Sequence, residues 1–393
     1  MESLKELYKI GPGSSSTYTI APYKAALLFK EHFKDAVSYD AELYGSISLS
    51  GKGYHTDQII TQTFAPKMCK IYFRLHWQHQ IENGFIYKAY DERNRVIGEW
   101  TILSLGAGSI EILETDFDFQ KPVYSYENLS DLLGACRTLN LSLPNLVKTY
   151  EPDIEEYLNQ VLNTMLHSVK NGLNNTGVLP GLLEVSRLAK TMYLQAESCD
   201  DLAIRNRLKV LAYAYGNSEE NATGGMVVSA PSCGSSGVMA SLMYHYYYDL
   251  GYSKYKLIQA LMVAGIFGNV VKTNATIMGA VGGCQVEIGT ACAMAAAAAS
   301  YLMDASLNQI EYAALVALEH HLGLTCDTVG EYVIVPCIER NAVAILRALD
   351  AALMAEHHTN SSKIPGSFDA VVRKMNYTGH KIRMDLRESL LAE

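Results

Sequence analysis

Cysteine is the residue type with the clearest chemical potential in this sequence. Eight cysteines in 393 residues are too few for a disulfide scaffold. Cys284, Cys326 and Cys337 each lie where neighbouring residues predict a loop or a helix junction, whereas Cys292 is predicted inside an alanine-rich helix as a small buried hydrophobe. The spacings match neither a zinc finger nor a CxxC ferredoxin run, and on spacing alone inert buried thiols are favoured.

Three loops rich in glycine and hydroxyl residues form a second group of candidates. They cover residues 11–19, 230–237 and 279–283, and each precedes a predicted helix. Exposed backbone amides at a helix N-terminus, together with short hydroxyl side chains, make a site for an anion such as a carboxylate. Serine and threonine also cap helices without any functional role, and for each loop taken singly this explanation is sufficient.

The elements that must position these residues fall into two parts. Before about residue 150, apolar residues follow helical spacing over 24–33 and alternate over 41–49, and a hairpin is predicted from 85–90 and 96–105. From Glu151 onward, long helical patterns replace the alternation. We therefore predict an α+β fold, with an N-terminal α/β domain over residues 1–150 and a large all-helical domain over residues 151–393.

Composition narrows the class of protein. Apolar residues make up 49% and charged residues 19% of the chain, which excludes a disordered chain. A net charge of −9 argues against binding to nucleic acid or to an anionic membrane. The start, residues 1–9, is predicted as a short amphipathic helix unlike a signal peptide, and the apolar stretch 291–303 is too short to span a bilayer. We expect a soluble cytoplasmic protein with reduced thiols.

Seven motifs in a fixed order point to a family. They are IGPGSSSTYTIAP, YGSISLSGKGYHTD, TGVLPGLL, NATGGMVVSAPSCGSSGVM, GNVVKTNATIMGAVGGCQVEIGTACAMAAAA, EHHLGLTCDTVG and VPCIERNAV. Together they resemble the oxygen-sensitive iron–sulfur L-serine dehydratases, in the form with both domains on one chain. The resemblance covers nearly the whole length and implies the same division into an α/β domain and a helical catalytic domain.

The resemblance implies a cofactor and a reaction. A [4Fe–4S] cluster would be held by Cys284, Cys326 and Cys337, with one open iron acting as a Lewis acid on the substrate hydroxyl, and no PLP is expected. Metal coordination can lower the pKa of a water-like leaving group, ~15.7 in bulk water, by several units. The implied reaction is β-elimination of L-serine to pyruvate and ammonia. A small amino-acid substrate and a homodimer are the implied partners.

The remaining roles follow by matching motif positions. Asn274 and Arg340 are expected close to the cluster, and Tyr18 and His55 are the candidate catalytic residues. Hydroxyl residues of the first two loops are expected to hold the substrate carboxylate and ammonium; they are Ser15, Ser16, Thr17, Thr19, Ser235 and Ser236.

Departures from the family pattern leave the substrate open. Tyr18 and Tyr54 stand at two positions where the family has histidine, with His55 adjacent to the second, and Val281 replaces an acid. Histidine titrates near neutral pH whereas tyrosine has a pKa of ~10 and mostly donates a hydrogen bond. Two alternatives therefore stand beside serine dehydration. One is a lyase for another β-substituted amino acid, and the other is a non-catalytic iron–sulfur sensor of amino acids or redox state.

Overall fold

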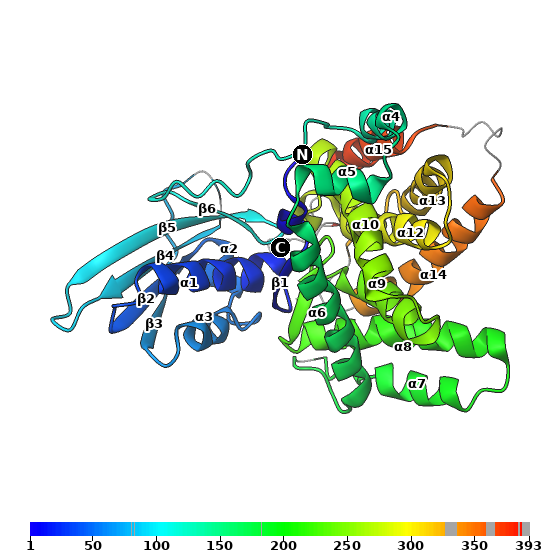
Figure 1. The fold of residues 1–393 in the computed structure, drawn as a ribbon. Coiled ribbons are helices and arrows are strands. Elements are labelled where there is room, and N and C mark those ends of the chain that lie inside the picture. The colour runs from blue at the N-terminus through cyan, green and yellow to red at the C-terminus, as the bar shows by residue number, and fades with distance from the viewer. Residues whose placement is uncertain are drawn as a thin grey trace. The chain divides into compact units, whose positions relative to one another are not determined.

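A computed structural model describes residues 1–79, 81, 83–181, 183–326, 336–358, 366–383 and 386 (Figure 1). The chain forms two compact units, one of Gly11–Lys121 and one of Met1–Ile10 together with Pro122–Glu393. The first contains the five-stranded sheet and the second is almost entirely helical. The predicted α+β fold is therefore confirmed.

The α/β unit is a mixed sheet with helices packed on it. The strand order is β3-β2-β4-β5-β6, in which β2 and β3 are parallel and the other neighbours antiparallel. The predicted hairpin is confirmed as β4 and β5. The elements are η2 (Ser16–Ile20), α1 (Ala21–His32), β2 (Ser38–Tyr44), α2 (Ser46–Ser50), α3 (Thr56–Phe64), β3 (Met68–Phe73), β4 (Gly84–Tyr90), β5 (Val96–Gly106) and β6 (Ser109–Ile112).

Aromatic rings fill the core between α1 and the sheet. Phe29 of α1 makes edge contacts with Tyr87 and Trp100, at centroid distances of 5.8 and 5.1 Å, and with Phe64 of α3 at 6.3 Å. Such edge-to-face contacts place the positive ring edge against the negative ring face. The core thus fixes α1 and α3 on the sheet, and with them the loops that precede these helices.

The predicted strand over 41–49 is only partly correct. Ala41 and Leu43 are buried in β2 as their alternation predicts. The strand ends at Tyr44, because Gly45 adopts a φ of 63° that few residues other than glycine tolerate, and the short helix α2 follows. Period-two alternation thus continued by coincidence into a helical segment.

The helical unit is built around a helix of small residues. In α12 every residue from Thr290 to Ser300 is buried, and the helix packs against α10, α13 and α14. The elements are α4 (Leu129–Leu139), α5 (Leu143–Tyr150), α6 (Ile154–Asn174), α7 (Ala189–Glu197), α8 (Leu202–Ala222), β7 (Met226–Ser229), α9 (Ser236–Tyr244), η3 (His245–Asp249), α10 (Lys254–Asn274), α11 (Gly279–Gly282), η4 (Gln285–Gly289), α12 (Thr290–Leu302), α13 (Leu307–Glu319), α14 (Cys337–Glu356) and α15 (Phe368–Lys381).

The helix α10 is the one described helix that is long and apolar enough to cross a membrane, with a mean hydropathy of 1.2. Of that apolar window, 78% is buried inside the protein, as expected for a core helix.

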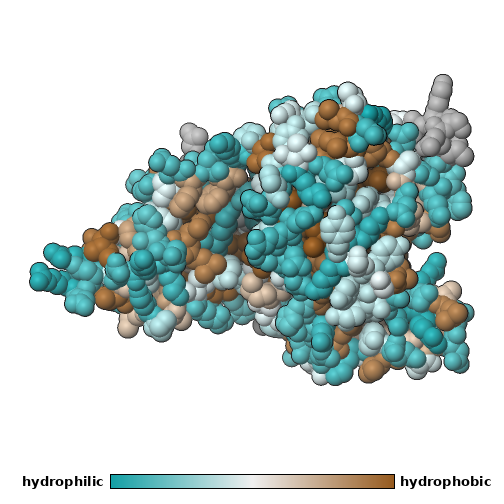
Figure 2. Space-filling view, in the orientation of Figure 1, coloured by the Kyte–Doolittle hydropathy of each residue, from teal (hydrophilic) through white to brown (hydrophobic). Residues whose placement is uncertain are grey.

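On the face drawn in Figure 2, hydrophobic residues are scattered among hydrophilic ones, which is ordinary for a protein surface in water.

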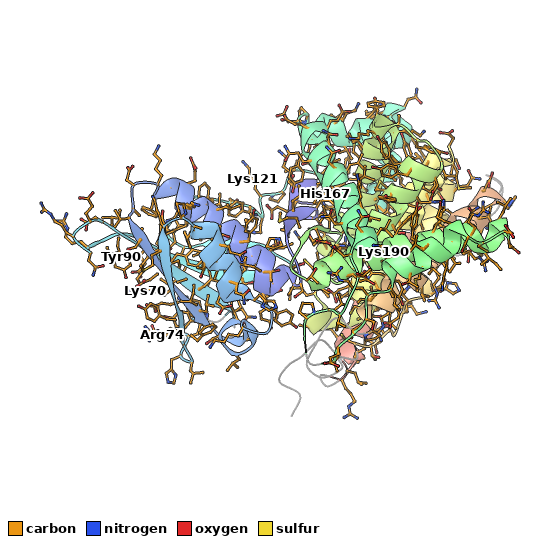
Figure 3. All side chains as sticks on the ribbon, turned by 90° about the horizontal axis from the view of Figure 1, so that it is seen from below. Lys70, Arg74, Tyr90, Lys121, His167 and Lys190 are labelled. Carbon is orange, nitrogen blue, oxygen red and sulfur yellow. The ribbon has the colours of Figure 1, made fainter. Side chains whose placement is uncertain are left out.

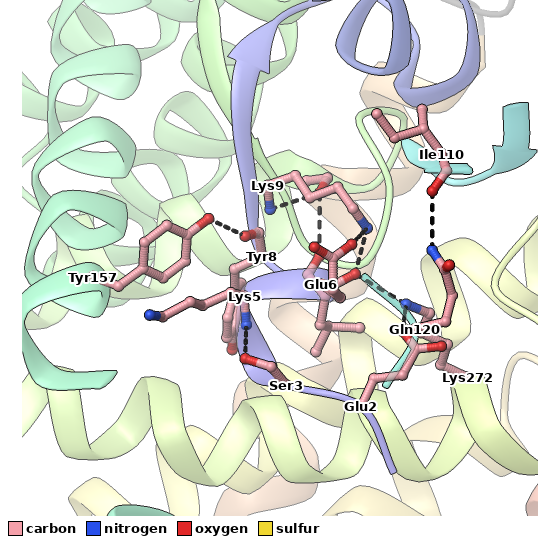
Figure 4. Close-up of polar contacts among 12 residues, drawn as sticks. Glu2, Ser3, Lys5, Glu6, Tyr8, Lys9, Ile110, Gln120, Tyr157 and Lys272 are labelled. Atoms are coloured by element: carbon pink, nitrogen blue, oxygen red, sulfur yellow. Dashed lines mark hydrogen bonds and ion pairs between the residues drawn. The ribbon is translucent and has the colours of Figure 1, made fainter. Parts of the chain in front are cut away.

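The first ten residues belong to the helical unit. They form a short 3-10 helix, η1 (Leu4–Glu6), and the start of strand β1 (Lys9–Pro12), so the predicted helix over 1–9 is wrong for most of its length. The Tyr8 hydroxyl donates to the carbonyl of Leu261 in α10 at 3.0 Å, and Lys272 of α10 pairs with Glu2 (Figure 4). Contacts with a distant helix therefore override the local helical spacing.

The helical unit begins at Pro122, before the change of sequence pattern near residue 150. The reason is visible at α4, whose first amides, on Leu129 and Ser130, donate to the carboxylate of Asp369 in α15 at 2.8 and 3.0 Å. The next helix, α5, packs on α10. Both helices are thereby bound to the helical core.

Candidate functional site

Three cysteine thiols gather in the helical unit. Cys284 follows α11, Cys326 lies beyond the end of α13, and Cys337 is the first residue of α14. All three side chains are buried, and the Cys284 thiol is hydrogen-bonded to those of Cys326 and Cys337. The structure therefore brings together the three cysteines that the motifs single out. Cys292 makes a different contact, with the carbonyl of Ala344.

The local geometry of this cluster depends on a glycine turn. Gly283 has a φ of +70°, and a Cβ at this position would lie 3.1 Å from the carbonyl oxygen of Leu324. The Gln285 amide donates to that same carbonyl at 3.0 Å, while its side-chain oxygen accepts from the Gly323 amide at 2.9 Å. These contacts hold the segment that carries Cys326 against the turn that carries Cys284.

Arg340 supplies positive charge to the thiols. It lies one helical turn after Cys337 in α14, and its Nη1 donates to Cys284 Sγ and to the Thr325 carbonyl, both at 3.0 Å. Hydrogen bonds from Cys326 and Cys337, and then the Arg340 charge, hold the pKa of the Cys284 thiol well below its usual range against the opposing effect of burial. The hydrogen bond with Cys284 and burial raise the pKa of Cys337. The thiolate favoured at Cys284 is the form of cysteine that binds metal.

The serine loop between β7 and α9 is internally bonded. Ser236 Oγ accepts from the Asn217 side chain at 2.7 Å and donates to the Cys233 carbonyl at 2.8 Å. Ser235 Oγ lies 3.1 Å from Ser232 Oγ. Both predicted substrate-binding hydroxyls are buried, and these bonds fix the shape of the loop. Their contact with a substrate stays a prediction.

Asn341 joins this loop to the cysteine helix, and sequence reasoning missed it. Its Nδ2 donates to the carbonyls of Gly234 and Cys337, both at 2.7 Å, and its Oδ1 accepts from the Val238 amide at 3.2 Å. The side chain is buried. Its place directly after Arg340 in the CIERN motif was the only available signal.

Glu287 is a second residue near the thiols to which the sequence assigned no role. It is 9% exposed, and its charge is one of the causes that raise the pKa of Cys337. A Cβ on Gly234 would lie 3.8 Å from its Oε1. An acid thus lies beside both the thiols and the serine loop.

Asn274 ends α10 and has structural bonds. Its Nδ2 donates to the carbonyls of Glu127 and Val270, at 2.6 and 3.0 Å. These bonds tie the end of α10 to the segment before α4. Its predicted position near the cluster stays a prediction.

In the α/β unit, the hydroxyl segment predicted as a loop before α1 is helical from Ser16 onward as η2, and it is held by its own side chains. Ser15 Oγ accepts from the Tyr18 amide at 3.3 Å, and Thr19 Oγ1 donates to the Pro12 carbonyl at 2.7 Å and accepts from the Ser15 amide. Ser16 is buried and Thr17 is half-buried. The loop has a defined shape before any ligand is considered.

The two tyrosines at altered motif positions lie face to face. The rings of Tyr18 and Tyr54 stack with centroids 4.5 Å apart and planes inclined by 13°. Thr56 Oγ1 donates to the Tyr18 carbonyl at 2.6 Å, which ties the two loops together. His55 lies between Tyr54 and Thr56 in the second loop and has a φ of 59°. Its buried Nδ1 has no hydrogen-bond partner in the part of the chain that the structure describes.

The predicted site residues therefore form one group in each unit. The cysteines, Arg340, Ser235 and Ser236 belong to the helical unit, and residues 15–19 and His55 belong to the α/β unit.

The donor set determines which metal group the thiols fit. Among the described ranges, no three His, Cys, Asp or Glu side chains are arranged to hold a metal ion. The thiols instead hydrogen-bond to one another. Three buried soft sulfur donors beside an arginine suit an iron–sulfur cluster rather than a hard ion such as Mg²⁺, which prefers oxygen. The residues thus fit such a cluster by chemistry.

Comparison with known proteins gives a consistent result. The profile of the serine dehydratase alpha chain matches residues 56–391, and that of the serine dehydratase beta chain matches residues 3–67. The chain is 34% identical to L-serine dehydratase 2 of Escherichia coli, with 99% of this chain and 97% of the relative covered. It is 31% identical to the L-serine dehydratases of Haemophilus influenzae (99% and 97% covered) and Streptomyces coelicolor (98% and 97% covered).

Proposed function

The chain belongs to the serine dehydratase family of carbon–oxygen lyases, and from this premise we propose that it deaminates L-serine to pyruvate and ammonia with a [4Fe–4S] cluster on Cys284, Cys326 and Cys337. The observation that carries the proposal is the meeting of these three buried thiols with Arg340. When bound, a cluster with one open iron supplies Lewis-acid activation of a β-hydroxyl group.

The residues around the thiols have distinct tasks in this proposal. The Arg340 guanidinium stabilises the anionic form of Cys284, so the ligand is ready to bind metal. Burial of all three thiols excludes water from the metal site. Asn341 sets the distance between the cysteine helix and the loop that carries Ser235 and Ser236.

Substrate binding is proposed for both hydroxyl loops. Ser235 and Ser236 lie in the loop that Asn341 ties to Cys337, and Ser15, Ser16, Thr17 and Thr19 form the loop of the α/β unit. Tyr18 and His55 are the proposed catalytic residues of this unit. Support for His55 comes from its buried ring nitrogen, which has no hydrogen-bond partner among the described residues and suits an exchange of protons with a ligand.

A second candidate is a lyase for another amino acid with a leaving group at Cβ. The stacked pair Tyr18–Tyr54 favours this candidate. The two phenols stand at positions where the family pattern has histidines, which titrate near neutral pH. Both candidates predict release of ammonia.

The experiment is a substrate screen on full-length protein, purified and reconstituted with iron and sulfide under anaerobic conditions. Ammonia release is measured with L-serine, L-threonine, L-cysteine and O-acetyl-L-serine. We expect L-serine to give the highest kcat/KM. Higher kcat/KM with another substrate would support the second candidate, and absence of turnover with an intact cluster would contradict both.

A soluble cytoplasmic enzyme and a homodimer complete the proposal. A reduced compartment suits three cysteines that must stay available to iron. Light scattering of the anaerobic protein would give the mass of the assembly, and a monomer would contradict the dimer.

A further inference from the structure

The serine loop, residues 230–237 between β7 and α9, is bonded to a second asparagine, Asn217 of α8. Asn217 Nδ2 donates to Ser236 Oγ at 2.7 Å, and its Oδ1 accepts from Ser168 Oγ at 2.6 Å. Ser168 lies in α6 directly after His167, which is labelled in Figure 3. The sequence assigned no role to Asn217 or to Ser168.

The direction of each bond in this chain follows from one carbonyl group. Ser236 Oγ lies 2.8 Å from the Cys233 carbonyl oxygen, and because a carbonyl only accepts, Ser236 must donate its single proton there. The Asn217 atom that faces Ser236 must then be the amide nitrogen, which leaves the oxygen for Ser168. Ser236 therefore has no proton to offer a substrate carboxylate, and its hydroxyl instead holds the peptide between Cys233 and Gly234.

The chain joins three helices in a buried position. Ser168 and Asn217 are 0% exposed and Ser236 is 1% exposed. Helices α6, α8 and α9 pack on one another, and Ser236 is the first residue of α9, where the loop ends. A buried polar group that loses its partner costs the free energy of its own desolvation, so each link restrains the loop strongly.

The same loop is held from α14 by Asn341, which donates to the Gly234 carbonyl at 2.7 Å. Gly237 shows how closely two helices approach this loop. A Cβ there would lie 2.6 Å from Ser218 Oγ of α8 and 3.0 Å from Asn341 Oδ1 of α14. The carbonyls of two consecutive residues, Cys233 and Gly234, are thus fixed from two different helices.

We propose that Asn217 and Ser236 are positioning residues for the reaction, which hold the Cys233–Gly234 peptide in place for substrate binding beside the cysteine helix. Ser168 orients the Asn217 amide. Ser236 acts through the loop and is not a donor to the substrate carboxylate. The inference rests on the proposed function, because it takes the serine loop as part of the amino-acid site.

The test compares KM, kcat and Tm of Asn217→Ala and Ser236→Ala with those of the unaltered full-length protein, all reconstituted anaerobically. We expect KM to rise about fivefold or more and kcat to change less than about twofold, because substrate binding is weakened while the cysteines keep their contacts. Loss of buried hydrogen bonds should lower the Tm of each variant by roughly 2–6 °C. Ser236→Thr, which keeps the hydroxyl, should restore KM.

The matched control is Ser241→Ala in the same helix, α9. The Ser241 hydroxyl is equally buried but donates to the Val210 carbonyl of α8, at 2.8 Å, and not to the loop. This variant should lower the Tm by a similar amount and leave KM unchanged. The dissociation constant of L-alanine, an unreactive analogue, gives a measure without turnover, and ligand-observed NMR should show it rising in the same variants as KM.

Two results would overturn the inference. A lower Tm with unchanged KM in Asn217→Ala and Ser236→Ala would make both residues merely structural. A raised KM in Ser236→Ala with an unchanged Tm, and no effect of Asn217→Ala, would make Ser236 a direct substrate contact. Failure of the proposed function is distinct, because the unaltered chain would release no ammonia from any β-substituted amino acid. L-Alanine binding that is absent, or equal in all variants, would then overturn the inference as well.

Discussion

Replacing Asn341 by leucine tests whether one side chain couples the serine loop to the cysteine helix. Leucine has nearly the same volume but removes the bonds to Gly234, Cys337 and Val238. The Val238 amide keeps its bond to the Ser235 carbonyl. Gly234 is only half-buried, so water can replace the hydrogen bond that its carbonyl loses. At about 1 kcal/mol for each bond, we expect the free energy of unfolding to fall by about 2–3 kcal/mol.

Two measurements test this expectation: the Tm of thermal unfolding, and kcat/KM for ammonia release. A loss of this size should lower the Tm of the helical unit by roughly 4–10 °C. We also expect kcat/KM to fall at least tenfold, because the loop with Ser235 and Ser236 is no longer held at a fixed distance from Cys337. The matched control is Asn163→Leu on the exposed face of α6, where the side chain bonds only Lys254 among the described contacts. Its stability should change by less than about 0.5 kcal/mol.

Two outcomes would refute this reasoning. If Asn341→Leu unfolds within 1 °C of the unaltered protein, the three bonds contribute nothing net. If it is destabilised but keeps full kcat/KM, Asn341 is structural and does not position the loop for catalysis.

Two further predictions concern stability. Gly283→Ala should lower the free energy of unfolding by about 1–2 kcal/mol, because φ is +70° and Leu324 crowds the new Cβ. Gly134→Ala on α4, where the Cβ meets open space, should instead raise it by about 0.5–1 kcal/mol. Chemical denaturation measures both changes, and effects of the same sign and size would contradict this contrast. Burial lowers the pKa of His321 to about 4 from 6.5. The unfolded chain therefore binds the extra proton first, and stability should fall by about 2 kcal/mol between pH 7 and pH 5. Denaturation of His321→Gln at both pH values should lack this component, and an undiminished pH dependence would exclude His321 as its source.

Much of the fold could be predicted because its patterns are local. The helix over 24–33, the hairpin and the alanine-rich core helix follow from spacing and turn residues alone. Local patterns failed where distant contacts decide the structure, as at residues 1–9, which pack on α10, and at residues 46–50, where Gly45 ends the strand.

The residues of the candidate site were likewise predicted where a local motif marks them and missed where distant contacts give them their role. The three cysteines were predicted from their motifs, and the structure gathers them. Asn341 and Glu287 lie inside motifs that were quoted, yet their roles depend on a loop about a hundred residues away in one case and on buried thiols in the other. Hydrogen bonds also link Tyr18 to Ser46 and Ser46 to Asn83, three residues from separate segments that no local sequence pattern brings together.

The most direct test of the cluster assignment is the iron and sulfide content of single cysteine variants after anaerobic reconstitution, with ammonia release from L-serine measured on the same samples. We predict about four irons and four sulfides per chain in the unaltered protein. Cys284→Ala, Cys326→Ala and Cys337→Ala should each lose most of the iron and the activity, and Cys292→Ala, whose thiol contacts Ala344, should keep both. Full iron content in any of the first three variants, or equal loss in Cys292→Ala, would contradict the assignment.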